Sequence, residues 1–272
     1  MTSPPAATDA ATGFPGVVVG KGPPLVLFPG MSRRPETRQL PYAGLARITN
    51  RRVYVLNRPA GLHRGLTMRD LAARHADALA ERFADPVDLI GISTGGAIAL
   101  QLAADHPGRV NRLIIAAAAS WLGDEGRSKL RRYADEIARG RSGAMVLASV
   151  LAPRGGEWLM VPMHWVAHQF EKRWDPNDLL ATIDAEAGFD VTPRLGEIRS
   201  PTLLIAGGRD RAFPPELVRA TAAGIPGSRL IVYPKAGHLG TMMNRHFGRD
   251  VAGFLATSHP PEPGDAAGAP AS

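Results

Sequence analysis

The pentapeptide at positions 91–95, Gly-Ile-Ser-Thr-Gly, has the residue types and the spacing needed to present a nucleophile. It joins an apolar run at 87–92 to an alanine-rich segment that is typical of a helix. A Ser on such a strand–turn–helix has its hydroxyl exposed above the sheet edge, and the tight turn requires small residues on either side. Gly91 and Gly95 meet that requirement. We therefore expect Ser93 to act as a nucleophile.

A Ser hydroxyl needs a base to take its proton. His238 follows the apolar run 229–233 through a short loop, and Asp210 follows the run 202–206 in the same way. If these runs are parallel strands, their carboxyl ends meet at the sheet edge that also carries Ser93. We expect His238 to accept the proton and Asp210 to orient the imidazole. Asp124 is a rival acid, but its polar, Gly-flanked surroundings indicate a solvated loop.

A tetrahedral intermediate also needs hydrogen-bond donors for its oxyanion. The backbone N–H of Thr94, directly after the nucleophile and at a helix start, is one candidate. The apolar run 25–28 ends in Pro29-Gly30, so the N–H of Met31 is the second candidate.

These segments resemble the α/β-hydrolase superfamily, in particular its small capped esterases, lactonases and C–C hydrolases. The resemblance covers about residues 14–256, and its motifs are Phe28-Pro29-Gly30, Gly91-Ile92-Ser93-Thr94-Gly95-Gly96, Gly207-Gly208-Arg209-Asp210 and Ala236-Gly237-His238. The order Ser, Asp, His is the order of that superfamily. Pro29 stands where the oxyanion loop of the family commonly has His, which we interpret as a variant. Ser93 argues against the haloalkane dehalogenases and epoxide hydrolases, whose nucleophile is Asp.

Short β-rich runs alternate with helical patterns along most of the chain. The predicted strands are 16–19, 25–28, 53–57, 87–92, 110–117, 202–207 and 229–233, and the predicted helices are 36–48, 67–83, 95–106, 214–224 and 239–256. Thr67 with Asp70 three residues later is typical of a helix start. The alternation predicts an α/β fold of the α/β-hydrolase type, with a mostly parallel, doubly wound sheet and a helical cap insert.

Strand patterns are missing between about 120 and 192, a segment that contains all four Trp residues. We predict a disordered N-terminus at 1–12, a hydrolase core at 13–119 and 193–256, a helical cap at 120–192 and a disordered tail at 257–272. An apolar pocket under such a cap needs bulky walls. Candidate lining residues are Phe28, His63, Trp121, Trp158, Met163, His164, Trp165 and Leu239.

Composition narrows the range of partners. The 32 Lys and Arg residues exceed the 25 Asp and Glu residues and give a net charge of +7. The basic residues are scattered, without interleaved aromatics, so no nucleic-acid partner is expected. The absence of Cys excludes disulfides and thiolate metal sites. His164 and His168 are four residues apart, but no matching Glu accompanies them, so we predict neither a metal nor a cofactor. No secretory signal or membrane span is apparent, and a cytoplasmic location is expected. The oligomeric state stays open.

The residues thus predict a serine hydrolase that cleaves a small, uncharged carboxylic ester, thioester or lactone through an acyl-enzyme. A C–C bond hydrolase or a cofactor-free haloperoxidase-like activity uses the same three residues and stays open. A second class also stays open, a small-molecule binding or receptor protein that keeps the hydrolase fold. The substrate itself is not predicted, because specificity lies in the pocket walls.

Overall fold

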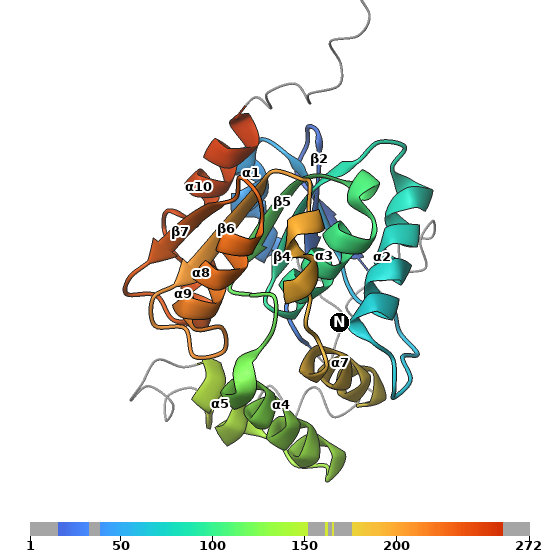
Figure 1. The fold of residues 1–272 in the computed structure, drawn as a ribbon, viewed down its shortest axis with the longest axis vertical. Coiled ribbons are helices and arrows are strands. Elements are labelled where there is room, and N and C mark those ends of the chain that lie inside the picture. Colours follow the sequence, from blue (N-terminus) through green and yellow to red (C-terminus); the bar gives the residue numbers. More distant parts are fainter. Residues whose placement is uncertain (1–15, 33–38, 152–160, 163–164, 166–175, 258–272) are drawn as a thin grey trace, which may run out of the picture.

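The computed structural model of the protein describes residues 16–32, 39–151, 161–162, 165 and 176–257. Its centre is a seven-stranded sheet with the order β1-β3-β2-β4-β5-β6-β7 (Figure 1). The strands are β1 (Gly16–Val19), β2 (Pro24–Phe28), β3 (Arg52–Leu56), β4 (Val87–Ile92), β5 (Val110–Ala116), β6 (Thr202–Gly207) and β7 (Arg229–Tyr233). Only the β1–β3 pairing is antiparallel, and the other five are parallel.

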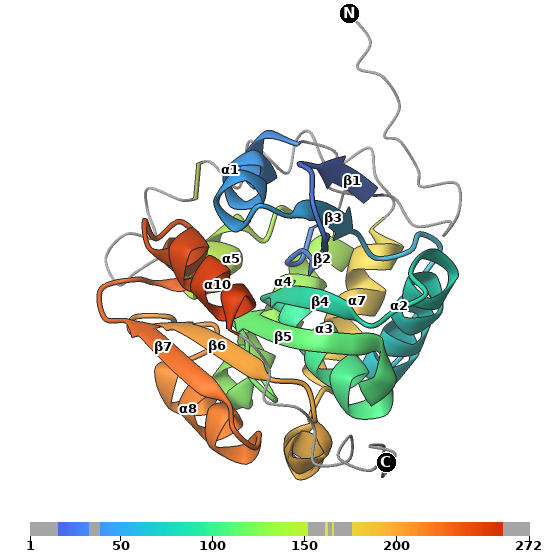
Figure 2. The same cartoon turned by 90° about the horizontal axis from the view of Figure 1, so that it is seen from above.

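Helices cover both faces of the sheet, as Figure 2 shows. The described helices are α1 (Leu40–Thr49), α2 (Met68–Arg82), α3 (Thr94–Asp105), α4 (Gly123–Ala138), α5 (Ala144–Leu151), α7 (Asn177–Ala187), α8 (Pro215–Gly224), α9 (His238–Met242) and α10 (Phe247–Ala256), with 3₁₀ turns at Pro107–Arg109 and Thr192–Glu197. One core lies between the sheet and α2, α3 and α8, and a second lies between the sheet and α1 and α10. The predicted doubly wound α/β fold is therefore confirmed.

Strand residues alternate between these two cores. In β2, Leu25 and Leu27 pack on the α1–α10 side, whereas Val26 and Phe28 pack on the α2–α3 side. Successive side chains of a strand point to opposite faces, so a strand covered on both faces must be apolar throughout. This is why continuous apolar runs located the strands in the sequence, each to within about one residue of its observed bounds.

The predicted helices are confirmed with two changes. The helix predicted at 36–48 begins at Leu40, and residues 33–38 lie outside the described part. The helix predicted at 239–256 is two helices, because the backbone turns at 243–246, where Asn244 Oδ1 accepts a hydrogen bond from the N–H of His246 at 3.0 Å. Such local side-chain bonds compete with helix continuation.

The helix start at Thr67 is confirmed as a capping box. Thr67 Oγ1 accepts a hydrogen bond from the N–H of Asp70 at 3.2 Å, and Asp70 Oδ2 accepts one from the N–H of Thr67 at 2.8 Å. Two backbone N–H groups at the start of the helix are thereby satisfied, which fixes the residue at which α2 begins.

The segment between β5 and β6 contributes α4, α5 and α7, which lie together beyond one end of the sheet (Figure 1). A small apolar cluster joins them, with Tyr133 and Ile137 of α4 packed against Leu179 and Ile183 of α7. None of the described helices is long and apolar enough to cross a membrane.

Candidate active site

Ser93 occupies a strained turn between β4 and α3, with φ 53° and ψ −124°. Residues other than Gly seldom adopt a backbone conformation with such a positive φ. The turn is held in place because the N–H of Ser93 donates to the carbonyl of Ala116 in β5 at 3.0 Å. A Cβ atom on Gly91 would lie 2.6 Å from the carbonyl oxygen of Gly95, and one on Gly95 would lie 2.6 Å from that of Pro29. Both glycines are therefore sterically required.

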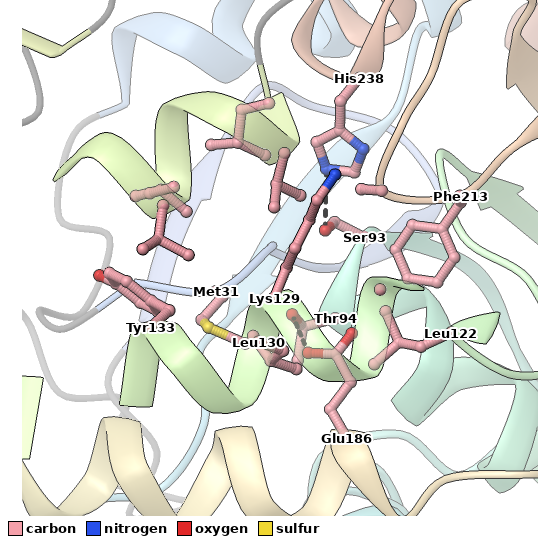
Figure 3. A pocket seen from close by; sticks show the side chains of 16 residues that line it. Met31, Ser93, Thr94, Leu122, Lys129, Leu130, Tyr133, Glu186, Phe213 and His238 are labelled. Carbon is pink, nitrogen blue, oxygen red and sulfur yellow. Dashed lines mark hydrogen bonds between the residues drawn. The ribbon is translucent and has the colours of Figure 1, made fainter. Parts of the chain in front are cut away.

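The three residues predicted to cooperate lie in one hydrogen-bonded line. His238 Nε2 is 3.0 Å from Ser93 Oγ (Figure 3). On the other side of the ring, His238 Nδ1 is 2.9 Å from Asp210 Oδ2. Asp210 and His238 are 4% and 3% exposed, so solvent competes little for these bonds. The other oxygen of Asp210 accepts the N–H groups of Ala212 and Phe213 at 2.8 and 3.0 Å, which fixes the carboxylate.

The two N–H groups predicted for an oxyanion hole belong to Met31 and Thr94, and both residues line the pocket beside Ser93. Neither N–H has a hydrogen-bond partner within the described part of the chain. Arg58 contacts the backbone on both sides of Met31. Its guanidinium donates hydrogen bonds to the carbonyl of Gly30 at 3.2 Å and to that of Ser32 at 2.8 Å. These two hydrogen bonds hold the loop that carries Met31 in place.

A pocket of about 520 Å³, counted out to its solvent opening, lies in front of Ser93. Its floor comes from the loops that follow the strands, and its walls come from α4, α5 and α7 (Figure 3). The lining is mostly apolar and consists of Met31, Ser93, Thr94, Leu122, Gly126, Lys129, Leu130, Tyr133, Val146, Leu147, Val150, Leu151, Glu186, Ala212, Phe213 and His238. Lys129 and Glu186 are the acidic or basic side chains of this lining besides His238, and Lys129 donates a hydrogen bond to Glu125 at 2.5 Å. The aliphatic remainder of the wall favours apolar parts of a ligand.

Glu186 is a polar residue of this pocket that the sequence analysis missed. It is 2% exposed, and it accepts a hydrogen bond from Thr94 Oγ1 at 2.8 Å. Burial penalises the ionised carboxyl and raises the pKa of Glu186 to about 7, although the Thr94 bond and the charge of Arg58 act in the opposite direction. A signal was present in the sequence, because Glu186 follows Ile183 by three residues and so shares the apolar face of its helix.

The comparisons with known proteins identify the family of the chain. A model of the alpha/beta hydrolase family matches residues 25–253. The chain belongs to the alpha/beta hydrolase family.

Two relatives of this hydrolase are pimeloyl-[acyl-carrier protein] methyl ester esterases of Neisseria meningitidis. The chain is 32% identical over 182 residues to the serogroup B protein, a match that covers 62% of this chain and 68% of the relative. It is 31% identical over 175 residues to the serogroup C protein, covering 60% of this chain and 66% of the relative. The chain therefore spans about two thirds of the length of these relatives.

Solved structures share the fold of the hydrolase. A thermophilic esterase from Thermogutta terrifontis matches with a TM-score of 0.70 and 24% identity, covering 88% of this chain and 92% of the esterase. The enol-lactonase from Burkholderia xenovorans LB400 also has a TM-score of 0.70, with 19% identity and coverage of 89% and 96%. At these identities the likeness concerns the fold alone.

The residues predicted to line the pocket are placed elsewhere or lie outside the described part. Phe28 is 1% exposed in the core, where its ring lies edge-on to His75 at 4.6 Å. It points behind the sheet, because it shares a face with Val26 rather than with the pocket. The His63 side chain is exposed on a loop. Trp158, Met163 and His164 lie outside the described residues.

The remaining predicted lining residues also lie away from the described wall. The guanidinium of Arg127 lies 5.5 Å from the centre of the Trp121 ring, and the backbone of Trp121 bridges to Asp190. Trp165 is 53% exposed. Leu239 is half-buried in α9 and is not part of the lining. Smaller aliphatic residues of α4 and α5 occupy the wall instead, because the apolar face of each helix turns inward.

Two alternatives to the predicted roles can be located. Asp124, the rival acid, lies exposed in the first turn of α4. Within the described ranges, no group of three or more His, Asp or Glu side chains is arranged to hold a metal. His164 and His168 lie outside those ranges.

Proposed function

We propose that this hydrolase is a serine hydrolase that cleaves a small, uncharged carboxylic ester, thioester or lactone through an acyl-enzyme on Ser93. The observation that carries the proposal is the line of hydrogen bonds from Ser93 through His238 to Asp210, which opens into an apolar pocket. The ester hydrolases among its relatives support the reaction class.

In the first half of the proposed reaction, Ser93 Oγ attacks the carbonyl carbon of the substrate while His238 Nε2 takes the Ser proton. Asp210 stabilises the resulting imidazolium across the 2.9 Å contact with Nδ1. The N–H groups of Met31 and Thr94 stabilise the oxyanion. The carbonyl reforms, the bond to the leaving oxygen or sulfur breaks, and His238 gives its proton to that atom.

In the second half, water attacks the acyl group on Ser93 while His238 takes a proton from it. Collapse of the second tetrahedral intermediate releases the carboxylic acid and restores the Ser hydroxyl. For a lactone, acid and alcohol remain in one molecule. All protons move between Ser93, His238, water and substrate, so the reaction needs no reactant other than the substrate and water.

We also propose that residues 120–192 form a cap that determines which acyl groups fit. Leu130, Val146, Leu147 and Val150 of α4 and α5 line the pocket opposite Ser93. A charged acyl group would lose its hydration against these side chains, and burying an unpaired charge is costly. Short to medium uncharged acyl chains should therefore be preferred.

The proposal is tested with p-nitrophenyl esters of increasing chain length and with δ-valerolactone. Ser93→Ala should lower kcat/KM by at least about 10³-fold, because the acyl-enzyme cannot form. Ser128→Ala is the matched control, since Ser128 is exposed on α4, and it should behave as wild type. Full activity of Ser93→Ala, or a preference for charged acyl groups, would contradict the proposal.

A further inference from the structure

Glu186 is the one carboxyl side chain among the described residues that line the pocket. It lies near the end of α7, and Figure 3 shows its carboxyl group beside Thr94, on the side of the pocket that carries Ser93. A carboxyl that is 2% exposed in mostly apolar surroundings is costly to keep. The esterase chemistry described above does not use it.

One oxygen of this carboxyl is engaged and the other is not. Oε2 accepts the hydrogen bond from Thr94 Oγ1 at 2.8 Å. No described residue donates a hydrogen bond to Oε1. Because Glu186 lines the pocket, Oε1 can accept a hydrogen bond from a ligand that enters it.

The neighbouring charges do not supply that partner. Arg58, Asp178 and His238 are the charged or titratable groups whose fields act on Glu186 or on Arg58 beside it. Arg58 directs its N–H groups to the carbonyls of Gly30 and Ser32. His238 uses its two nitrogens on Asp210 and Ser93. Asp178 accepts the N–H of Leu62 at 2.6 Å and has no proton to donate when ionised.

We propose that Glu186 determines substrate specificity, its Oε1 accepting a hydrogen bond from a neutral N–H or O–H group of the substrate. This inference rests on the proposed function and narrows it to esters, thioesters or lactones that carry an amide or hydroxyl donor. A site that accepts such a bond discriminates against an analogue without the donor, because a bound ligand that shields Oε1 from water then leaves this acceptor unpaired.

Two pairs of isosteric esters test the inference. The acyl pair is p-nitrophenyl N-acetylglycinate and p-nitrophenyl 4-oxopentanoate, which differ by N–H against CH₂. The alcohol pair is 2-acetamidoethyl butyrate and 4-oxopentyl butyrate, which differ in the same way on the leaving group. The measured quantity is the ratio of kcat/KM within each pair, corrected for spontaneous hydrolysis, for wild type and for Glu186→Gln.

Gln keeps a carbonyl oxygen that can accept the Thr94 bond but can place an NH₂ group where Oε1 lies. We expect the donor-to-non-donor ratio of at least one pair to be tenfold or more higher in wild type than in Glu186→Gln. Glu216→Gln is the control, because the Glu216 side chain is 74% exposed, and it should keep the wild-type ratio. Equal ratios in wild type and Glu186→Gln would overturn the inference, even if the variant were slower on all four esters, since Glu186 would then only hold Thr94.

Failure of the proposed function looks different. In that case neither the four esters nor p-nitrophenyl butyrate would show hydrolysis that depends on Ser93. Binding of N-hexylacetamide and of 2-nonanone, measured by calorimetry, then decides the question for Glu186. Tighter binding of the amide by wild type, lost in Glu186→Gln, supports the inference, and the absence of such a preference overturns it.

Discussion

Replacing Glu186 by Gln should raise the free energy of unfolding in mildly alkaline solution and change it little in acid. The side chain is buried, and its pKa in the folded protein is raised from 4.5 to about 7. Between these two values the folded protein keeps the proton that the unfolded chain has already lost. The unfolded state then binds fewer protons, so the stability of wild type falls as pH rises through this window. Gln has no proton to lose and avoids that penalty.

The size of the effect follows from the two pKa values. Each pH unit between 4.5 and about 7 corresponds to about 1.4 kcal/mol, which gives roughly 3 kcal/mol in total. About 2.5 kcal/mol of this falls between pH 5 and pH 8.5. The attraction of Arg58 and the Thr94 hydrogen bond are already contained in the raised pKa, because both lower it against the larger effect of burial.

The assay is urea unfolding at pH 5, 6, 7 and 8.5, followed by Trp fluorescence, for wild type, Glu186→Gln and the exposed control Glu216→Gln. The advantage of Glu186→Gln over wild type should grow with pH, and the control should show no such trend. A difference that does not change with pH, or one that shrinks as pH rises, would refute the reasoning. It would mean that Glu186 is ionised in the fold and stabilised by its surroundings.

Three further predictions concern the elements around the site. Gly95→Ala should lower the free energy of unfolding by about 1–3 kcal/mol, because its Cβ would lie 2.6 Å from the carbonyl oxygen of Pro29. Gly253→Ala is the control, since nothing lies within 4 Å of its new Cβ. Equal melting temperatures of Gly95→Ala and wild type would contradict the prediction. Burial lowers the pKa of His75 from 6.5 to about 4, so between these values the folded protein keeps His75 neutral while the unfolded chain binds a proton. The free energy of unfolding of wild type should therefore fall by up to roughly 3 kcal/mol as pH drops from 6.5 to about 4. His75→Met should lose less stability over this range, and parallel pH profiles of the two proteins would contradict the prediction. Arg58→Met should lower kcat on p-nitrophenyl butyrate at least tenfold, because the loop around Met31 loses the hydrogen bonds that Arg58 donates to Gly30 and Ser32. An unchanged kcat would show that the loop keeps its conformation without these bonds.

The sequence was most informative where a physical constraint acts on one residue type. Tight packing at the elbow admits only Gly at positions 91 and 95. Burial on both faces makes each parallel strand an apolar run, so the loops that carry Asp210 and His238 could be placed at one edge of the sheet. The structure has His238 within hydrogen-bond distance of Ser93, and Asp210 within hydrogen-bond distance of His238.

The pocket walls could not be predicted in this way. The sequence predicts a lining rich in bulky aromatic residues, yet the described wall is made mainly of aliphatic residues of α4 and α5, such as Leu130 and Leu147. Which face of a helix turns inward depends on how the helices pack against one another, and composition alone does not determine that packing. Phe28 shows the same problem for a strand, since its position in the alternation directs it away from the pocket. Glu186 shares the apolar face of α7 with Ile183, but no motif in the sequence indicates that this face meets Thr94.

The central claim is that Ser93 is a nucleophile activated by His238, and intact-mass analysis after labelling with a fluorophosphonate probe tests it without a known substrate. We predict one adduct on wild type, no adduct on Ser93→Ala, and labelling slowed at least about 10³-fold on His238→Ala. An adduct that persists on Ser93→Ala, or folded wild type that takes up no probe, would contradict the account.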